Sequence, residues 1–309
     1  MIDYHLLLSV LIGVSILIIL ILKFKIQPFL GLLISSILVG VLAGVAPLEI
    51  MNTVKEGMGS TLGFVAVVVG LGAMFGAILE HSGGAEALAQ YLLKSFGEKN
   101  ASWALMITGF FIAIPVFFDV AFIVLIPLVY SLQRKTKKSM LLYAIPLLAG
   151  LAITHAFIPP TPGPVAVADI LNADLGWVIL VGFIVGIPTA IVSGPIFGKF
   201  IASKIFIAAP KKIDEKVVDN FPPIHLILSI IATPILLIVL NTLLNSPLGS
   251  SLNLSDKTTT WLQMIGHPFS ALIIANLMAW YLLGIRRGVS KAILSKITSA
   301  SLAPAGIII

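Results

Sequence analysis

The sequence predicts an all-α, polytopic membrane protein with inverted repeats, a re-entrant helical hairpin and a discontinuous helix. Three observations predict this class: a very apolar composition, long apolar runs separated by basic connections, and prolines that interrupt two of those runs. Hydrophobic residues make up 59% of the 309 residues and charged residues only 10%. A soluble domain carries about 25% charged residues, so a water-soluble fold of this chain would expose very large apolar surfaces.

This composition excludes several classes of protein. A soluble enzyme would need more charge, and a disordered protein would need the opposite balance of charge and hydrophobicity. The chain contains no cysteine, which excludes disulfide frameworks, thiolate metal sites and cysteine nucleophiles. We therefore expect the lipid bilayer to surround most of the chain.

Each apolar run is near or above the length of about 20 residues that a transmembrane helix needs. The first run has neither a basic leader nor a small-residue cleavage site, so we expect a retained span rather than a signal peptide. A further apolar run begins at Leu302 and stops at Ile309, which predicts that the chain is truncated at its C-terminus. The complete runs cover residues 5–22, 28–46, 61–80, 102–132, 140–173, 175–198, 223–245 and 261–284.

Lysine and arginine indicate the orientation, because short cytoplasmic loops are enriched in them. With the N-terminus outside, every Lys and Arg except Lys55 and Lys257 falls on an inner connection. The net charge of +6 then belongs to membrane topology, and nucleic acid is not an expected partner. This assignment holds only if segment 102–132 returns to the side on which it starts.

Segment 102–132 is about 31 residues long and carries Pro115 near its middle. Two full crossings need about 40 residues, and one crossing would place the basic cluster 134–138 on the outer side. We therefore expect a re-entrant helical hairpin with its tip, residues 115–119, inside the bilayer. Non-helical backbone is tolerated there only if protein or a wet cavity covers it. The alternative is one long, tilted helix with a kink at the proline.

Segment 140–173 starts inside and must end outside, but four prolines interrupt it in the run IPPTPGP at 158–164. Proline cannot donate a backbone hydrogen bond and restricts the residue before it, so a helix cannot continue through this run. We expect a discontinuous helix with one half ending near His155 and the other beginning near Gly163. Span 175–198 then returns the chain to the inside.

Broken helices near the middle of a membrane often belong to repeats of opposite topology. Segments 47–68 and 287–308, which lie 240 residues apart, share an amphipathic stretch followed by an apolar run. Spans 5–22 and 223–245 cross in opposite directions when the basic residues set the topology. Both observations favour two inverted halves.

The predicted organisation is therefore two repeats. Residues 1–210 form the first inverted repeat, which holds the scaffold spans, the hairpin 102–132, the broken helix 140–173 and span 175–198. Residues 211–309 form an incomplete second repeat, which lacks a hairpin and a broken helix of its own.

An ionisable group inside a span costs about 2.5–3.5 kcal/mol on insertion scales, so each one needs a reason. Asp119 lies at the hairpin tip in FFDVAF, and we expect its carboxylate to exchange a proton or contact a polar substrate. The alternative is a helix N-cap, which aspartate also suits. His155 directly precedes the break and has either a site role or the structural role of a hydrogen-bonded histidine.

The break adds groups that suit an anion. Thr154 and Thr161 offer hydroxyls, and Gly163 lets the backbone approach a ligand closely. Helix N-termini at the break and the tip present unpaired N–H groups and a positive dipole end. No Lys or Arg lies at mid-membrane depth in this topology. An anionic substrate would rely on these groups, with a co-transported cation to cancel its charge.

Glu80, in GAILEHSGGAEALA, has a more ordinary interpretation. We expect a solvated helix end at this residue, followed by an interfacial helix at 84–97. Gly70, Gly72 and Gly76 precede it in an apolar span without a following lysine, which favours helix packing over a phosphate loop.

Three stretches carry a resemblance to a known family: ILEHSGGAEALA at 78–89, IPVFFDVAFIVLIPL at 114–128 and HAFIPPTPGPVAVA at 155–168. Through them the chain resembles the gluconate permease (GntP) family of bacterial proton symporters, which belongs to the ion-transporter superfamily. The resemblance implies a secondary active transporter that imports gluconate, or a related sugar acid or hydroxy acid, with protons across the inner membrane. D-serine or another small carboxylate is the alternative substrate within the same family.

The resemblance also implies where the site lies and what it binds. The family pattern falls on Asp119 and on the stretch from His155 to Gly163, the positions reached above from the residues themselves. The implied partners are a small organic anion such as gluconate, protons and the lipid bilayer, and a homodimer is an open alternative. No cofactor and no metal are implied. Family members are typically longer, which agrees with the expected truncation.

Two interpretations from other classes stay open: an intramembrane enzyme that uses His155 and Asp119, and a non-functional membrane fragment. An enzyme of this kind needs a nucleophile or a metal cluster, and no such constellation is found in the sequence. We therefore expect a transporter rather than an enzyme.

Overall fold

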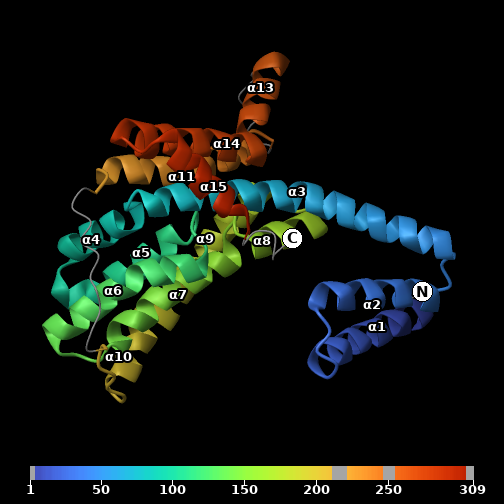
Figure 1. The fold of residues 1–309 in the computed structure, drawn as a ribbon, viewed down its shortest axis with the longest axis horizontal. Helices are drawn as coiled ribbons and strands as arrows, with labels where there is room; N and C mark the ends of the chain where they lie inside the picture. The colour runs from blue at the N-terminus through green and yellow to red at the C-terminus, as the bar shows by residue number, and fades with distance from the viewer. Residues whose placement is uncertain (1–3, 211–220, 246–254, 304–309) are drawn as a thin grey trace. The chain divides into compact units, whose positions relative to one another are not determined.

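The computed structural model describes residues 4–210, 221–245 and 255–303. These described residues form helices joined by short connections, with no strand among them. The chain is an all-α, polytopic membrane protein, as its composition predicts (Figure 1). Six of the described helical segments are long and apolar enough to cross a membrane: Tyr4–Leu22, Pro47–His81, Leu141–Ile170, Leu175–Ala202, Ile224–Leu244 and Pro268–Arg287.

The chain divides into two compact units, residues 1–64 and residues 65–309. In the first unit, α1 and α2 pack closely because Gly13 carries no side chain. A Cβ on Gly13 would come within 2.2 Å of Val39 Cγ2. The helices that begin in this unit are α1 (Tyr4–Leu22), α2 (Pro28–Leu42) and α3 (Pro47–His81), the last of which continues into the second unit.

The second unit contains the remaining helices and the predicted site. Short 3-10 turns lie at η1 (Glu98–Asn100) and η4 (Ile285–Arg287), and π-helical turns at η2 (Val192–Ile196) and η3 (Trp280–Gly284). The α-helices of this unit after α3 are α4 (Gly84–Phe96), α5 (Ala101–Ile112), α6 (Phe118–Thr136), α7 (Leu141–Phe157), α8 (Pro162–Ile170), α9 (Leu175–Ile191), α10 (Phe197–Ala202), α11 (Ile224–Leu244), α13 (Asp256–Gly266), α14 (Pro268–Ala279) and α15 (Lys291–Ala300).

The segment 102–132 turns back on itself. Ser102 Oγ donates to the Leu142 carbonyl at 2.7 Å, and Thr154 Oγ1 donates to the Phe110 carbonyl at 2.9 Å. These two bonds join matching ends of α5 and α7, so the two helices run parallel. Because α6 connects the end of α5 to the start of α7, it must run in the opposite direction.

An ion pair closes the base of this hairpin. Lys135, near the end of α6, pairs with Glu98, just before α5. The helix is also interrupted at 113–117, so the alternative of one long, kinked helix is wrong. The predicted hairpin has the expected geometry, with its two ends together and its tip at the opposite end.

The segment after α10 holds the turn between α6 and α7 in place. Met140 N donates to the Ile207 carbonyl at 2.8 Å, and Ser139 Oγ donates to the Ile205 carbonyl at 2.9 Å. Further along, Ala209 N donates to Gln133 Oε1 at 3.2 Å. The base of the hairpin is therefore fixed by hydrogen bonds to a distant part of the chain as well as by the ion pair.

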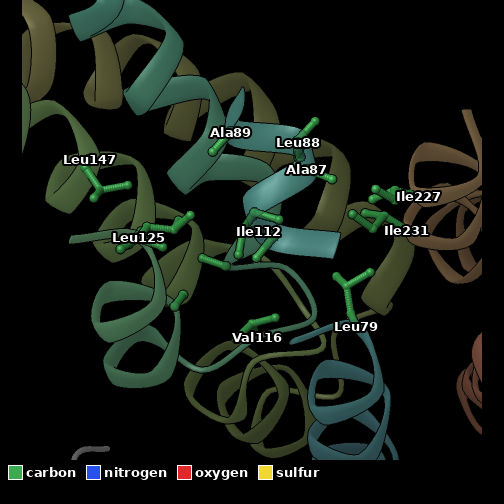
Figure 2. Close-up of a cluster of buried hydrophobic side chains, with 14 of the residues drawn as sticks. Leu79, Ala87, Leu88, Ala89, Ile112, Val116, Leu125, Leu147, Ile227 and Ile231 are labelled. Atoms are coloured by element: carbon green, nitrogen blue, oxygen red, sulfur yellow. The ribbon is translucent and has the colours of Figure 1, made fainter. Parts of the chain in front are cut away.

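The core of the second unit is built from α3 to α7 with α11 and α14. Figure 2 shows its centre, where Leu125 of α6 and Leu147 of α7 lie near Ile112 at the end of α5. The helix α4, expected to be interfacial, forms as predicted but contributes one face to this core. Ala87, Leu88 and Ala89 are among its buried residues. Which face of α4 is covered depends on neighbours from distant sequence.

One predicted span begins later than expected. The run 261–284 was expected to be continuous, but α13 ends at Gly266 and α14 begins at Pro268. Proline lacks the N–H that would continue the first helix and is well suited to the first position of a new one. His267 caps α14, because its Nδ1 accepts a hydrogen bond from Phe269 N at 3.3 Å.

The start of α14 resembles the start of α2, as expected for two copies of a repeat. Pro268 and Pro28 lie 240 residues apart and each opens a helix whose preceding side chain accepts a backbone N–H. This offset equals the one between segments 47–68 and 287–308. The inverted repeats and their division at residue 210 stay predictions. Of the final apolar run, residues 304–309 lie outside the described residues.

The crossing of α5 and α7 depends on two glycines. A Cβ on Gly150 would come within 2.2 Å of the Met106 carbonyl oxygen, and a Cβ on Gly109 within 2.6 Å of the Leu147 carbonyl oxygen. Both obstacles are backbone atoms, which cannot rotate away as a side chain can. Glycine at both positions is what lets α5 and α7 approach this closely.

Gly150→Ala tests this packing. The added methyl group forces the two backbones apart, and overpacking of this kind costs about 1–3 kcal/mol. We expect a lower midpoint of thermal unfolding in detergent. The matched control is Gly57→Ala in α3, where a Cβ would have nothing within 4 Å and should leave the midpoint unchanged or raised. An unchanged midpoint for Gly150→Ala would contradict the close crossing.

Candidate functional site

The hairpin tip lies against α3. Pro115 and Val116 are buried in the connection between α5 and α6. A Cβ on Gly76 would come within 2.1 Å of the Pro115 carbonyl oxygen, so only glycine allows the tip to approach at this position. The expected role of Gly76 in helix packing is confirmed, and its partner is the non-helical backbone of the tip.

The broken helix meets α3 one turn away. Helix α7 ends at Phe157 and α8 begins at Pro162, which confirms the discontinuous helix. Pro160, in the break, lies 3.7 Å from the position of a Cβ on Gly72. Gly72 and Gly76 are four residues apart and therefore lie on one face of α3. One helix face thus contacts both interruptions.

A cavity of about 380 Å³ opens beside the tip. This volume lies within the range of small-molecule sites. A small crevice shares Ala73 and the tip residues with it and continues to Pro160 and Thr161 of the break. The larger cavity is lined by Ala73, Gly76, Ala77, Glu80 and His81 of α3, by Pro115, Val116, Phe117 and Val120 of the tip and α6, and by Ile297, Ala300 and Ser301 of α15 and its end.

Asp119 and His155, from two different helices, lie within electrostatic reach of each other. The Asp119 carboxylate interacts electrostatically with the His155 imidazole, and the ring of Phe117 lies edge-on to that imidazole at 6.4 Å between centroids. His155 Nδ1 is buried with no hydrogen-bond partner among the described residues. This orphaned nitrogen disfavours the alternative of a fully hydrogen-bonded structural histidine.

The capping interpretation of Asp119 is wrong. Helix α6 begins at Phe118, its N-cap is Phe117, and no side chain caps it. Asp119 is instead exposed within the first helical turn, where a carboxylate is favoured by the positive end of the helix dipole. The helix starts earlier than the aspartate suggested, because the tip ends at Phe117.

The remaining predicted residues have different environments. Thr154 is fully buried, and its hydroxyl proton is already donated to the Phe110 carbonyl. Thr161 lines the crevice, and its hydroxyl donates to the Ile158 carbonyl at 2.7 Å. Gly163 is exposed, and a Cβ there would have nothing within 4 Å. Thr161 therefore joins the tip, whereas Thr154 points to α5 and Gly163 faces open space.

Sequence reasoning missed Glu80 as a cavity residue. It was expected to be a solvated helix end, but it is half-buried and lines the 380 Å³ cavity with His81. The spacing of Gly72, Gly76 and Glu80 is a signal that could have found it. Residues four apart lie on one helix face, and the glycines mark the face that meets the tip.

No metal centre is formed by the residues that the structure describes. Among them, no three His, Asp or Glu side chains come close enough to hold an ion.

Discontinuous helices that meet beside a cavity are typical of transporters among membrane proteins. Comparison with known families supports this class and makes it specific. The family model of the GntP family permeases matches residues 5–309, and the chain belongs to this family.

Individual relatives agree with the family. The chain is 36% identical to the gluconate permease of Pseudomonas aeruginosa, covering 99% of its own length and 68% of that protein. It is 38% identical to the low-affinity gluconate transporter of Escherichia coli, covering 96% and 66%. It is also 38% identical to the inner membrane permease YgbN of that species, covering 96% and 67%.

The chain thus spans about two thirds of the length of the curated relatives it matches. The matches do not confirm the truncation that the sequence predicts. They do identify a permease rather than an enzyme, which excludes the intramembrane enzyme considered above.

Gly76→Ala tests whether the hairpin tip packs against α3 at this glycine. Because the added methyl group collides with the Pro115 carbonyl, the tip should move away and expose Val116, which is 4% exposed. The chain has no cysteine of its own, so Val116→Cys provides a single site for labelling. We expect maleimide to react severalfold faster with that cysteine when Gly76→Ala is also present.

The control for this experiment is Gly63→Ala, on the same helix, where a Cβ would have nothing within 4 Å. It should leave the labelling rate of Val116→Cys unchanged. Equal rates in all three backgrounds would show that α3 does not hold the tip.

Proposed function

We propose that the chain acts in secondary active transport, importing gluconate or a related sugar acid with protons across the inner membrane. The observation that carries the proposal is that both helix breaks meet at one place. Pro115, Val116 and Phe117 line the 380 Å³ cavity and also the crevice that reaches Pro160 and Thr161. The names of the relatives, two gluconate transporters and an inner membrane permease, support the substrate and the location.

The start of each broken helix offers groups for a carboxylate. The first N–H groups of a helix have no partner within the helix, and at α6 no side chain caps them. At α8 no side chain caps the start either, but Pro162 and Pro164 have no N–H, so Gly163 supplies the backbone donor there. Other helices also start without a side-chain cap; α6 and α8 differ in beginning at the tip and at the break, where a positive dipole end can meet an anion.

The charge of the cavity favours a co-transported proton. No Lys or Arg is among the described residues that line it, and Glu80 contributes a negative group. An anion that enters a negative-inside cell moves against about 2.3 kcal/mol per charge per 100 mV. A proton carried with the anion cancels this cost without a basic side chain in the site.

The predicted site residues fit this scheme in different ways. Asp119 and His155 form the pair that exchanges a proton or contacts the substrate. Thr161 and Gly163 lie at the start of α8, where substrate would reach backbone donors. Thr154 acts as a positioning residue, because its buried hydrogen bond ties α7 to the end of α5.

Alternating access would then follow the division of the fold. The hairpin and the broken helix form the moving part, and the neighbouring spans form the scaffold, as inverted-repeat transporters do. The contacts of Gly72 and Gly76 with the two breaks would make α3 the surface along which they move together.

Uptake by purified protein in proteoliposomes tests the proposal. With an inward proton gradient, labelled gluconate should accumulate above its outside concentration, and a protonophore should abolish the accumulation. Competition by idonate, other sugar acids and D-serine then ranks the substrates. Uptake no greater than in empty liposomes would contradict the proposed function and favour a non-functional fragment.

Asp119→Asn tests the predicted carboxylate. Loss of its ionisable group should abolish proton-driven accumulation of gluconate, because the pair with His155 can no longer exchange a proton. The matched control is Asp256→Asn, another exposed aspartate in the first turn of a helix, which should accumulate gluconate as the unmodified chain does. Unchanged accumulation in Asp119→Asn would remove this residue from the mechanism.

A further inference from the structure

Among the described residues that line the 380 Å³ cavity, one carries a carboxylate. Glu80 lies one turn beyond Gly76 on the face of α3 that meets the tip, and it lines the cavity. Asp119, the carboxylate that the sequence favoured, is exposed and is not part of that wall. A proton that enters or leaves the cavity therefore meets Glu80 directly.

A second carboxylate lies next to Glu80. Gly83, in the left-handed conformation with φ of 73°, turns the chain from α3 into α4. The turn brings Glu86 within electrostatic reach of Glu80. Glu86 Oε2 is buried and has no hydrogen-bond partner among the described residues. Burial of this oxygen disfavours the ionised form, and a backbone hydrogen bond to the Glu86 carboxylate offsets only part of that cost.

Burial raises the pKa of the Glu86 carboxyl above its ordinary value, and the nearby negative charge of Glu80 adds to the rise. Two carboxylates close together in a poorly hydrated place cannot both ionise easily, so a pair of this kind tends to hold one proton. A proton on either glutamate therefore relieves the repulsion between the two carboxylates.

The basic side chain beside this carboxylate in the described wall is His81, whose positive form attracts the Glu80 carboxylate. Among the described lining residues, the titratable side chains are Glu80 and His81, both on α3. The tip and Val120 contribute only apolar side chains and backbone. Helix α15 contributes Ile297, Ala300 and the nearby Ser301. No Lys or Arg of the described wall holds Glu80 in its ionised form.

We propose that Glu80, with Glu86 beside it, is the proton-binding site of the cavity, and that an organic anion enters when this pair carries its proton. The inference rests on the proposed function and deepens it, because it adds a proton-binding group in the cavity wall to the pair of Asp119 and His155, which is not part of that wall. An ionised Glu80 would repel a carboxylate in the same cavity, whereas a protonated Glu80 removes the repulsion and can donate a hydrogen bond. The Glu80 side chain then couples the binding of the proton to the binding of the organic anion.

Transport with and without a proton gradient tests the coupling. In proteoliposomes, an inward proton gradient should stimulate gluconate uptake by the unmodified chain, and this stimulation should disappear in Glu80→Gln. In Glu86→Gln, the pH of half-maximal uptake should move downward, because the neighbouring charge that favours a proton on Glu80 is gone. The matched control is Glu56→Gln, an exposed glutamate on the same helix, which should respond to the gradient as the unmodified chain does.

An infrared measurement tests the proton site without relying on transport. At neutral pH, the unmodified chain and Glu56→Gln should show the band of a protonated carboxyl group. The band should be weaker in Glu80→Gln, because the negative charge that adds to the rise of the Glu86 pKa is gone, and weaker in Glu86→Gln, because the buried carboxyl group itself is gone. Circular dichroism of each variant checks that its helices are retained.

The outcomes separate this inference from the proposed function. If the unmodified chain takes up no gluconate, the proposed function fails, and the infrared band alone decides whether the pair holds a proton. If the unmodified chain is proton-coupled and Glu80→Gln is stimulated equally by the gradient, the transport proposal stands and Glu80 is not the coupling group. An identical carboxyl band in Glu80→Gln and the unmodified chain would overturn the proton site.

Discussion

Backbone that leaves a helix inside a bilayer must be covered by protein or reach a wet cavity, because its polar groups cannot be left in hydrocarbon. In this chain, one face of α3 meets both interruptions. Gly76 lets the Pro115 carbonyl approach, and Gly72 lies against Pro160. The location of the site follows from this constraint, since a tip and a break covered by the same helix face must lie next to each other.

The hairpin depends on a second set of contacts. Because Gly109 and Gly150 carry no side chains, the backbones of α5 and α7 come into direct contact where the two helices cross. The ion pair between Glu98 and Lys135 joins the two ends of the hairpin. These contacts hold the base of the hairpin, while α3 holds its tip. The proposed alternating access would move the hairpin and the broken helix as one part, and these contacts at the base would keep the hairpin intact during the movement.

Local chemistry explains what the sequence could predict. The break at 158–161 was predictable because proline removes hydrogen bonds wherever it stands, and four prolines fall within seven residues. The hairpin was predictable from length and charge, because about 31 residues cannot cross twice and the basic residues after them must stay inside. These inferences need no knowledge of neighbouring helices.

Features set by distant neighbours were not predictable in the same way. The start of α6 at Phe118, rather than after Asp119, depends on how the tip packs against α3. The burial of one face of α4 depends on α5 and α11. The spacing of Gly72, Gly76 and Glu80 marks the helix face on which Glu80 lies, but the tip and α15, which enclose the cavity, come from distant parts of the sequence.

The central claim is that the chain enters the membrane at α5 and leaves it on the same side after α6. Single cysteines at Asn100→Cys and Lys137→Cys, both exposed positions at the base of the hairpin, test it most directly in a chain without cysteine. A membrane-impermeant maleimide should label both in inside-out vesicles and neither in right-side-out vesicles. Asn172→Cys, between α8 and α9, should show the opposite pattern. Labelling of Asn100→Cys and Lys137→Cys from opposite sides would contradict the account.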